Sequence, residues 1–225
     1  MIMARRLGPD QPFYALAPHG LNGSSVPDTV EAMAASYIQM IREVQPQGSY
    51  LLGGFCNGGT VALEMAQQLR DRGEEVTLVV LVAAPARNAL AKRFARRFTD
   101  ALGTLLGFGA EKKLRLFFGL RAGVRPVRRL LRRIRGLYRK RKSPTGDLFL
   151  RSLSTYIARP YSGRVALYWP SESGSSAEAS RDWRQLVPHI EVQSVPGDHV
   201  SCVAVHAEVL GERLKTCLEE AQEKG

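Results

Sequence analysis

The stretch Gly54-Phe55-Cys56-Asn57-Gly58 has the pattern Gly-x-nucleophile-x-Gly, with a thiol at its centre. The apolar run Tyr50-Leu51-Leu52 precedes it, and residues 60–69 follow it with apolar side chains at helical spacing. This order predicts a strand, a sharp turn and a helix. The flanking glycines allow a turn that holds the central side chain at the strand's carboxyl end, beside a helix N-terminus that favours negative charge. We therefore predict that Cys56 is a nucleophile. The alternative is a buried structural cysteine in a glycine-rich turn.

Further strands are predicted downstream of this turn. Residues 76–82 form a continuous apolar run rich in valine, which is typical of a parallel strand buried on both faces. Residues 164–169 and 190–195 have similar strand character, and a helix is predicted from about residue 205 to 219. Strands that alternate with helices indicate an α/β fold with a mostly parallel sheet.

The region before the pentapeptide is predicted to hold one more strand and one helix. Residues 13–16 are expected to form a short strand, which a Gly/Ser-rich loop follows through Ser25. A helix with an apolar face over residues 30–41 comes next, with Asp28 as its expected cap.

Residues 89–156 interrupt the alternation with helical patterns. Strand-forming segments lie on both sides of this stretch, so it is expected to be an insertion and not a separate domain. With 225 residues, the chain is the right length for a single domain, residues 1–225, that includes this helical lid insertion.

The composition indicates an ordinary globular protein, with 44% hydrophobic and 24% charged residues. We find no stretch of membrane-spanning length and no signal peptide, and we expect a cytoplasmic location. The three cysteines, Cys56, Cys202 and Cys217, have neither metal-ligand spacing nor an even number, which fits a reducing compartment. Cys202 and Cys217 are predicted to be packing residues.

A thiol nucleophile requires a base that takes its proton. His199 follows the last predicted strand and precedes the final helix, which is where α/β hydrolases carry their histidine. We predict that His199 is the general base, and the alternative is a solvated loop histidine. The other histidines are predicted to lie on the surface: His19, His189 and His206.

The acid that would orient the base is less well marked. The strand after the nucleophile helix ends at Ala83 without a carboxylate, so the loop before the last strand offers Glu172 as the candidate and Asp182 as the reserve. Asp198 is expected to cap the turn beside the histidine. A Cys-His dyad without an acid is the alternative, because a free thiol has a pKa of about 8.5, much nearer neutrality than a hydroxyl.

The oxyanion that forms during acyl transfer needs two N–H donors. The residue after the nucleophile supplies one of them, and here that residue is Asn57. The sequence does not identify the second donor.

Three stretches carry a resemblance to a known family: residues 7–16, 45–54 and 197–199. They resemble the type I thioesterase domains that end polyketide synthase and nonribosomal peptide synthetase assembly lines. The similarity runs over about residues 4–85 and 160–220, whereas residues 89–156 are similar only in being a helical lid of variable sequence.

This resemblance implies an α/β-hydrolase fold and a substrate that arrives as a thioester on the phosphopantetheine of an acyl or peptidyl carrier domain, with no directly bound cofactor and no metal. The chain would move to Cys56 and leave by hydrolysis or by intramolecular cyclisation. Three departures stand out. Cys56 replaces the family's serine, Ala83 stands where an aspartate is common, and the family's opening strand with its oxyanion loop would lie before Met1, which suggests truncation at the N-terminal strand.

The formal charge of +11 is concentrated in one segment, since 18 of the 32 basic residues lie between Lys92 and Lys142 with only two acids among them. Residues 128–142 place apolar side chains on one helical stripe and arginines elsewhere. Three interpretations stay open: a solvated lid face, a docking surface for an acidic carrier domain or its phosphopantetheine, and a surface for nucleic acid or membrane. Nucleic acid is the partner we least expect.

The leading hypothesis is therefore a carrier-dependent thioesterase or cyclase. The alternative from another class is a catalytically silent module of α/β-hydrolase type that docks an acidic partner through residues 92–142.

Overall fold

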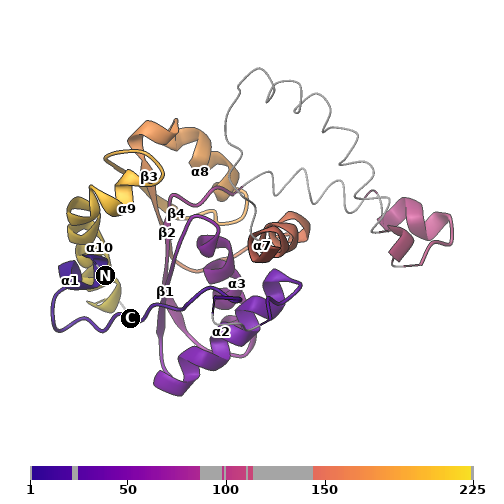
Figure 1. Cartoon of the computed structure of the whole chain (residues 1–225), viewed down its shortest axis with the longest axis horizontal. Helices are drawn as coiled ribbons and strands as arrows, with labels where there is room; N and C mark the ends of the chain where they lie inside the picture. Colours follow the sequence, from indigo (N-terminus) through magenta and orange to yellow (C-terminus); the bar gives the residue numbers. More distant parts are fainter. Residues whose placement is uncertain are drawn as a thin grey trace. The chain divides into compact units, whose positions relative to one another are not determined.

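The protein contains a four-stranded parallel sheet whose strands follow one another in sequence order (Figure 1). The computed structural model describes residues 2–21, 25–86, 98, 100–109, 111–113 and 144–223. The strands are β1 (Tyr50–Phe55), β2 (Val76–Val82), β3 (Val165–Pro170) and β4 (Ile190–Val195). The predicted α/β class with a parallel sheet is confirmed, and the four strands from residue 50 onward lie where the sequence indicates.

Alternating side chains of the strands build a core on each face of the sheet. Leu78 and Val80 of β2 belong to a buried cluster that also contains Leu210 of helix α10 (Ala207–Glu223) and Leu7 of helix α1 (Ile2–Leu7). Helices α1 and α10 thus cover one face of the sheet together.

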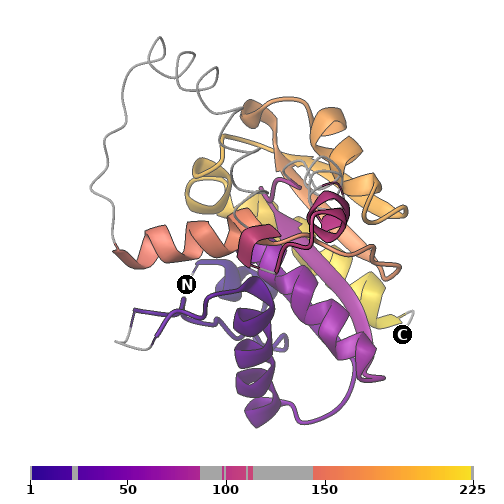
Figure 2. The ribbon, with the colours of Figure 1, turned by 90° about the vertical axis from the view of Figure 1, so that its right-hand side faces the viewer.

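On the other face, α3 (Gly58–Asp71) packs against β1 and β2, and α2 (Val30–Val44) packs beside α3 in the view of Figure 2. The hydroxyl of Thr29 caps α2 by accepting the N–H of Ala32 at 3.1 Å. The prediction of Asp28 as the cap was wrong by one residue, because it is Thr29 that has the extended backbone a cap requires, with φ −131° and ψ 156°.

Residues 13–16 form no strand, and this prediction was wrong. Phe13 and Tyr14 are 45% and 67% exposed, and none of the four described strands pairs with this segment. A β-prone sequence gains its backbone hydrogen bonds only from a neighbouring strand, so without one the local preference does not become a strand.

The chain divides into two compact units, residues 1–87 with 144–225, and residues 88–143. The first unit holds the whole sheet together with α7 (Pro144–Thr155), η1 (Ser171–Ser173), α8 (Ser176–Arg184) and α9 (Ser201–Ala204). The basic stretch 128–142 lies outside the described residues. Across the described ranges, no helix is both long enough and apolar enough to cross a membrane.

Candidate active site

Cys56 lies in a sharp turn between β1 and α3. Its φ is +56°, in the left-handed region that non-glycine residues rarely adopt. Its N–H donates to the carbonyl of Val82 at 2.8 Å, and its carbonyl accepts the N–H of Gly59 at 3.2 Å. The turn therefore begins as a continuation of the sheet and ends as the first turn of α3. The side chain of Cys56 is partly exposed, as a nucleophile requires.

The glycines of this turn have different roles. A Cβ on Gly54 would lie 2.3 Å from the carbonyl carbon of Gly58, so only glycine fits at this position. A Cβ on Gly58 would meet nothing within 4 Å. The second tight position is Gly59, where a Cβ would lie 2.7 Å from the Cβ of Ala84. The pentapeptide pattern thus identifies one of the two glycines that sterics demand and misses the other, which lies just beyond it.

Ala83 lies at the end of β2, beside the turn that carries Cys56. Phe55 pairs with Val82 in the sheet, so the residue after each strand emerges at the same edge. Ala83 also has a left-handed backbone, with φ +48°, and its N–H donates to the carbonyl of Tyr168 at 2.9 Å. It is buried, and its methyl group offers no carboxylate to the site.

His199 follows β4, and its ring contacts the ring of Phe55. The two ring centroids are 5.0 Å apart, with 34° between the ring planes. Because Phe55 directly precedes Cys56, this contact brings the predicted base to the residue beside the predicted nucleophile. The structure therefore places His199 beside the strand end that carries Cys56, although the two residues are far apart in sequence.

The backbone around His199 is held by a short network. Gly197 has φ +87°, and a Cβ there would lie 2.4 Å from the hydroxyl of Ser201. The carboxylate of Asp198 accepts the N–H groups of Ser201 and Val200 at 2.7 and 2.9 Å, as expected of a turn cap. These hydrogen bonds, first those with Ser201 and then that with Val200, hold the pKa of Asp198 below its usual value.

The candidate acids differ in how they relate to this loop. Glu172, in η1, donates its backbone N–H to the carbonyl of Gly197 at 3.0 Å, so its turn lies against the histidine loop. In the part of the chain that the structure describes, neither its carboxylate nor that of Asp182 forms a hydrogen bond with the ring of His199. Asp182 lies in α8. Its neighbour Trp183 donates its indole N–H to the carbonyl of Ala84 at 2.7 Å.

Asn57 is the N-cap of α3, and its carbonyl accepts the N–H of Thr60 at 3.1 Å. Its own N–H has no acceptor among the residues described, which leaves it available to an oxyanion. The role remains a prediction, as do the roles of Cys56, His199 and Glu172.

The other two cysteines are buried, His19 and His206 are partly buried, and His189 is exposed. Burial raises the pKa of the thiols of Cys202 and Cys217, which makes both poor nucleophiles. The imidazole of His19 forms a hydrogen bond with the hydroxyl of Ser36 at 3.1 Å and contacts the ring of Tyr37 at a tilt of 48°, and burial lowers its pKa. The prediction that these three histidines lie on the surface is confirmed for His189, whereas His19 and His206 are only partly exposed.

Helix α3 is anchored at several points along its length. Glu64 is buried, and its carboxylate accepts the hydroxyl of Tyr156 at 2.7 Å and the amide of Gln68 at 2.9 Å. Gln67 donates to the carbonyl of Arg159 at 2.7 Å. These contacts fix the helix whose N-terminus closes the turn at Cys56.

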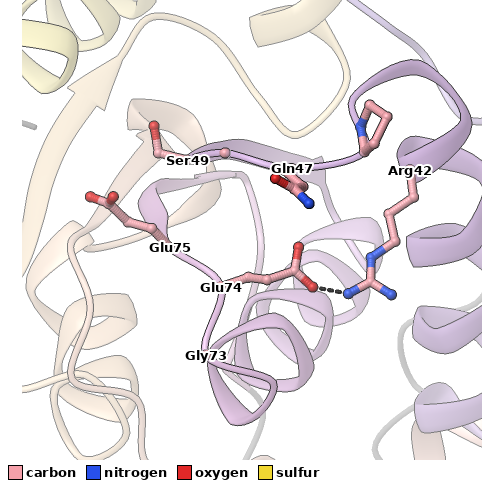
Figure 3. Close-up of a pocket in the computed structure, with 8 residues that line it drawn as sticks. Arg42, Gln47, Ser49, Gly73, Glu74 and Glu75 are labelled. Atoms are coloured by element: carbon pink, nitrogen blue, oxygen red, sulfur yellow. Dashed lines mark ion pairs between the residues drawn. The ribbon is translucent and has the colours of Figure 1, made fainter.

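A cavity of about 470 Å³ lies at the other end of the sheet, at the amino ends of β1 and β2 (Figure 3). Arg42 and Glu74 form an ion pair in its wall, next to Gln47 and Ser49. β1 separates this cavity from Cys56 by its full length, about 20 Å. The cavity therefore does not belong to the candidate active site. Within the described ranges, no group of three or more His, Cys, Asp or Glu residues is arranged to hold a metal ion.

Comparison with known proteins gives consistent matches. The thioesterase domain family model matches residues 2–217. A dimodular nonribosomal peptide synthase of Bacillus subtilis (strain 168) is 41% identical over 104 residues, 46% of this chain. Polyketide synthase PksR of the same organism is 35% identical over 96 residues, 42% of this chain. The chain spans only 4% of the length of each of these two relatives.

A solved structure extends the likeness to three dimensions. The NocB thioesterase domain, crystallised as a covalent complex with a fluorophosphonate nocardicin G analogue, is 26% identical with a TM-score of 0.55. The match covers 87% of this chain and 78% of that one. Because the family model covers nearly the whole chain and the fold agrees, this protein belongs to the thioesterase domain family and has the α/β-hydrolase fold.

Proposed function

We propose that this protein releases an acyl or peptidyl chain from the phosphopantetheine thioester of a carrier domain through a covalent acyl-enzyme on Cys56. The chain then leaves by hydrolysis or by intramolecular cyclisation. The names of the relatives support this substrate class, because they are nonribosomal peptide and polyketide synthases.

One observation carries the proposal: a partly exposed thiol in a left-handed turn, between a parallel strand and a helix N-terminus. This conformation costs about 1–3 kcal/mol for a residue other than glycine, and such strain collects at functional sites. The N-terminus of α3, which begins at Gly58, presents a partial positive charge beside Cys56. The ring of His199 lies against the ring of Phe55, the residue directly before Cys56.

The proposed reaction is an acyl transfer in two steps, acylation of Cys56 and then release of the chain. The Cys56 thiol gives its proton to His199 and attacks the thioester carbonyl, and the pantetheine sulfur leaves and takes up that proton. The N–H of Asn57 stabilises the oxyanion between these events. Water, or an amine or hydroxyl of the bound chain, then attacks the Cys56 thioester, and His199 removes the proton of the attacking group. The bond between the acyl carbon and the Cys56 sulfur breaks, and the sulfur takes up that proton from His199, which restores the free thiol.

Intact-protein mass spectrometry after exposure to an acyl-pantetheine thioester tests this proposal. We expect a single acyl adduct that turns over in the wild type and accumulates in His199→Ala. Cys217→Ala is the matched control, since it removes a thiol but leaves Cys56 in place, and it should behave as the wild type does. If no adduct forms and no pantetheine thiol is released, the result favours the catalytically silent docking module.

The thiol has a chemical consequence for release. Transfer to a serine gives an ester, whereas transfer to Cys56 preserves a thioester that remains activated towards amines and hydroxyls. We therefore propose that release favours cyclisation or aminolysis. In Cys56→Ser, the ratio of cyclic product to acid should fall. An unchanged ratio would count against this part of the proposal.

A further inference from the structure

The orientation of the His199 ring is not set by a hydrogen bond to any described residue. Its main chain is held well, because the thiol of Cys202 donates to its carbonyl at 3.5 Å and Asp198 caps the following turn. These contacts fix the backbone, but the imidazole still rotates about two side-chain bonds. A contact other than a hydrogen bond is therefore needed to hold the His199 ring towards Cys56.

The ring of Phe55 is placed to do this. Its centroid lies 5.0 Å from that of His199 with the planes at 34°, within the separation that paired aromatic rings prefer. Phe55 is also 40% exposed, at the carboxyl end of an edge strand of the described sheet. A large apolar side chain that is so exposed contributes little to the core.

We infer that Phe55 is a positioning residue that orients His199 towards Cys56, the task that a carboxylate performs in a Ser-His-Asp triad. This inference rests on the proposed function. When His199 takes the proton of the thiol it becomes an imidazolium, and the face of a phenyl ring attracts such a cation. Phe55 thereby couples the nucleophile, to which it is adjacent in sequence, to the base, which it contacts in space.

The position of Phe55 within the turn explains why it can be rigid enough for this role. Gly54 before it has no room for a side chain, and Cys56 after it is fixed to the carbonyl of Val82. Both backbone neighbours of Phe55 are therefore held, so its side chain leaves the backbone from a defined place at the strand end.

The test compares Phe55→Leu with Phe55→Tyr, with acylation of Cys56 measured in single turnover from an acyl-pantetheine thioester. Leucine keeps apolar cover but removes the aromatic face, and we expect acylation about three- to tenfold slower. The apparent affinity for the thioester should not change, since Phe55 acts on His199. Phe55→Tyr keeps the ring and should stay within about twofold of the wild type. Phe13→Leu, an aromatic of similar exposure at 45%, is the control and should react as the wild type does.

A double-mutant cycle separates this role from a structural one. In a His199→Ala background, Phe55→Leu should cause no further loss of rate, because the residue through which Phe55 acts is gone. A loss of the same size in both backgrounds overturns the inference, and so does a Phe55→Leu variant that reacts as fast as the wild type. Thermal unfolding of each variant checks that slower acylation does not reflect a smaller folded fraction.

The two proposals fail in different ways. A wild type that forms no acyl-enzyme overturns the proposed function and this inference with it. A wild type that reacts, with Phe55→Leu at an equal rate, overturns the inference alone.

Discussion

Cys56 and Ala83 follow neighbouring strands at the same edge of the sheet, and both have a left-handed backbone, with φ of +56° and +48°. The left-handed region costs an L-residue about 1–2 kcal/mol at each position. At Cys56 this strain holds a partly exposed thiol beside a helix N-terminus. At Ala83 the same strain holds a buried methyl group. Backbone strain therefore marks both positions, but only Cys56 carries a side chain that can act as a nucleophile.

The largest effect is expected when the thiol is removed. Cys56→Ala should lower the release of pantetheine thiol at least about a thousandfold, because the covalent intermediate can no longer form. The matched variant at the other strand end, Ala83→Gly, should retain most of the wild-type rate. A Cys56→Ala variant that kept more than a tenth of the wild-type rate would show that the strand end at Cys56 carries no essential nucleophile and does not differ in this respect from the strand end at Ala83.

The turn at Cys56 depends on its first glycine more than on its last. Gly54→Ala forces a Cβ against the backbone of Gly58, and we expect the free energy of unfolding to fall by more than about 3 kcal/mol. Gly58→Ala enters open space at the start of α3 and should change stability by no more than about 1 kcal/mol, in the favourable direction. Urea unfolding of the two variants measures this difference. Equal losses would contradict the steric account of the turn.

A smaller effect tests the strain at Ala83. Ala83→Gly relieves the left-handed backbone but adds freedom to the unfolded chain, so we expect a net gain of about 0.5–1 kcal/mol. Ala66→Gly in the interior of α3 is the opposite control and should lose about 1 kcal/mol or more. A loss at Ala83 similar to that at Ala66 would show that the backbone there is not strained.

The smallest effect concerns the strand end that carries His199. The ionised carboxylate of Asp198 accepts the N–H groups of Ser201 and Val200 more strongly than the protonated acid would, and its pKa is therefore lowered on folding. The stability it contributes is therefore present above the pKa of an unfolded aspartate, about 3.9, and is lost as the pH falls through the lower, folded value. Asp198→Ala should be less stable than the wild type from about pH 5 upward, and the gap should close in acid. Urea unfolding of Asp198→Ala and of the wild type across this pH range measures the gap, and a gap that stays unchanged in acid would contradict the prediction.

The strands were the best predicted part of the fold. Residues 76–82 and 190–195 have continuous apolar or alternating patterns, and β2 and β4 have these bounds. Residues 13–16 have an equally good local pattern but no pairing partner among the described strands, which a pattern within one segment cannot reveal. Strand formation depends on the neighbour as well as on the segment.

The parts of the site that depend on the local order of residues were predictable from the sequence. The parts that depend on packing between distant segments were not. The pentapeptide correctly indicated a turn after a strand, because Gly54 is required locally. The need for Gly59 arises from contact with Ala84, and the ring contact between Phe55 and His199 joins segments over a hundred residues apart, so neither leaves a local signal.

Peptide mass spectrometry can locate the acyl group and thereby tests whether Cys56 is the nucleophile. The protein is quenched shortly after it is mixed with an acyl-pantetheine thioester, digested and analysed for acylated peptides. We expect acylation on the peptide that contains Cys56, and none on those that contain Cys202 or Cys217. Acyl groups on another residue, or product formation with no acylated peptide in wild type or His199→Ala, would contradict it.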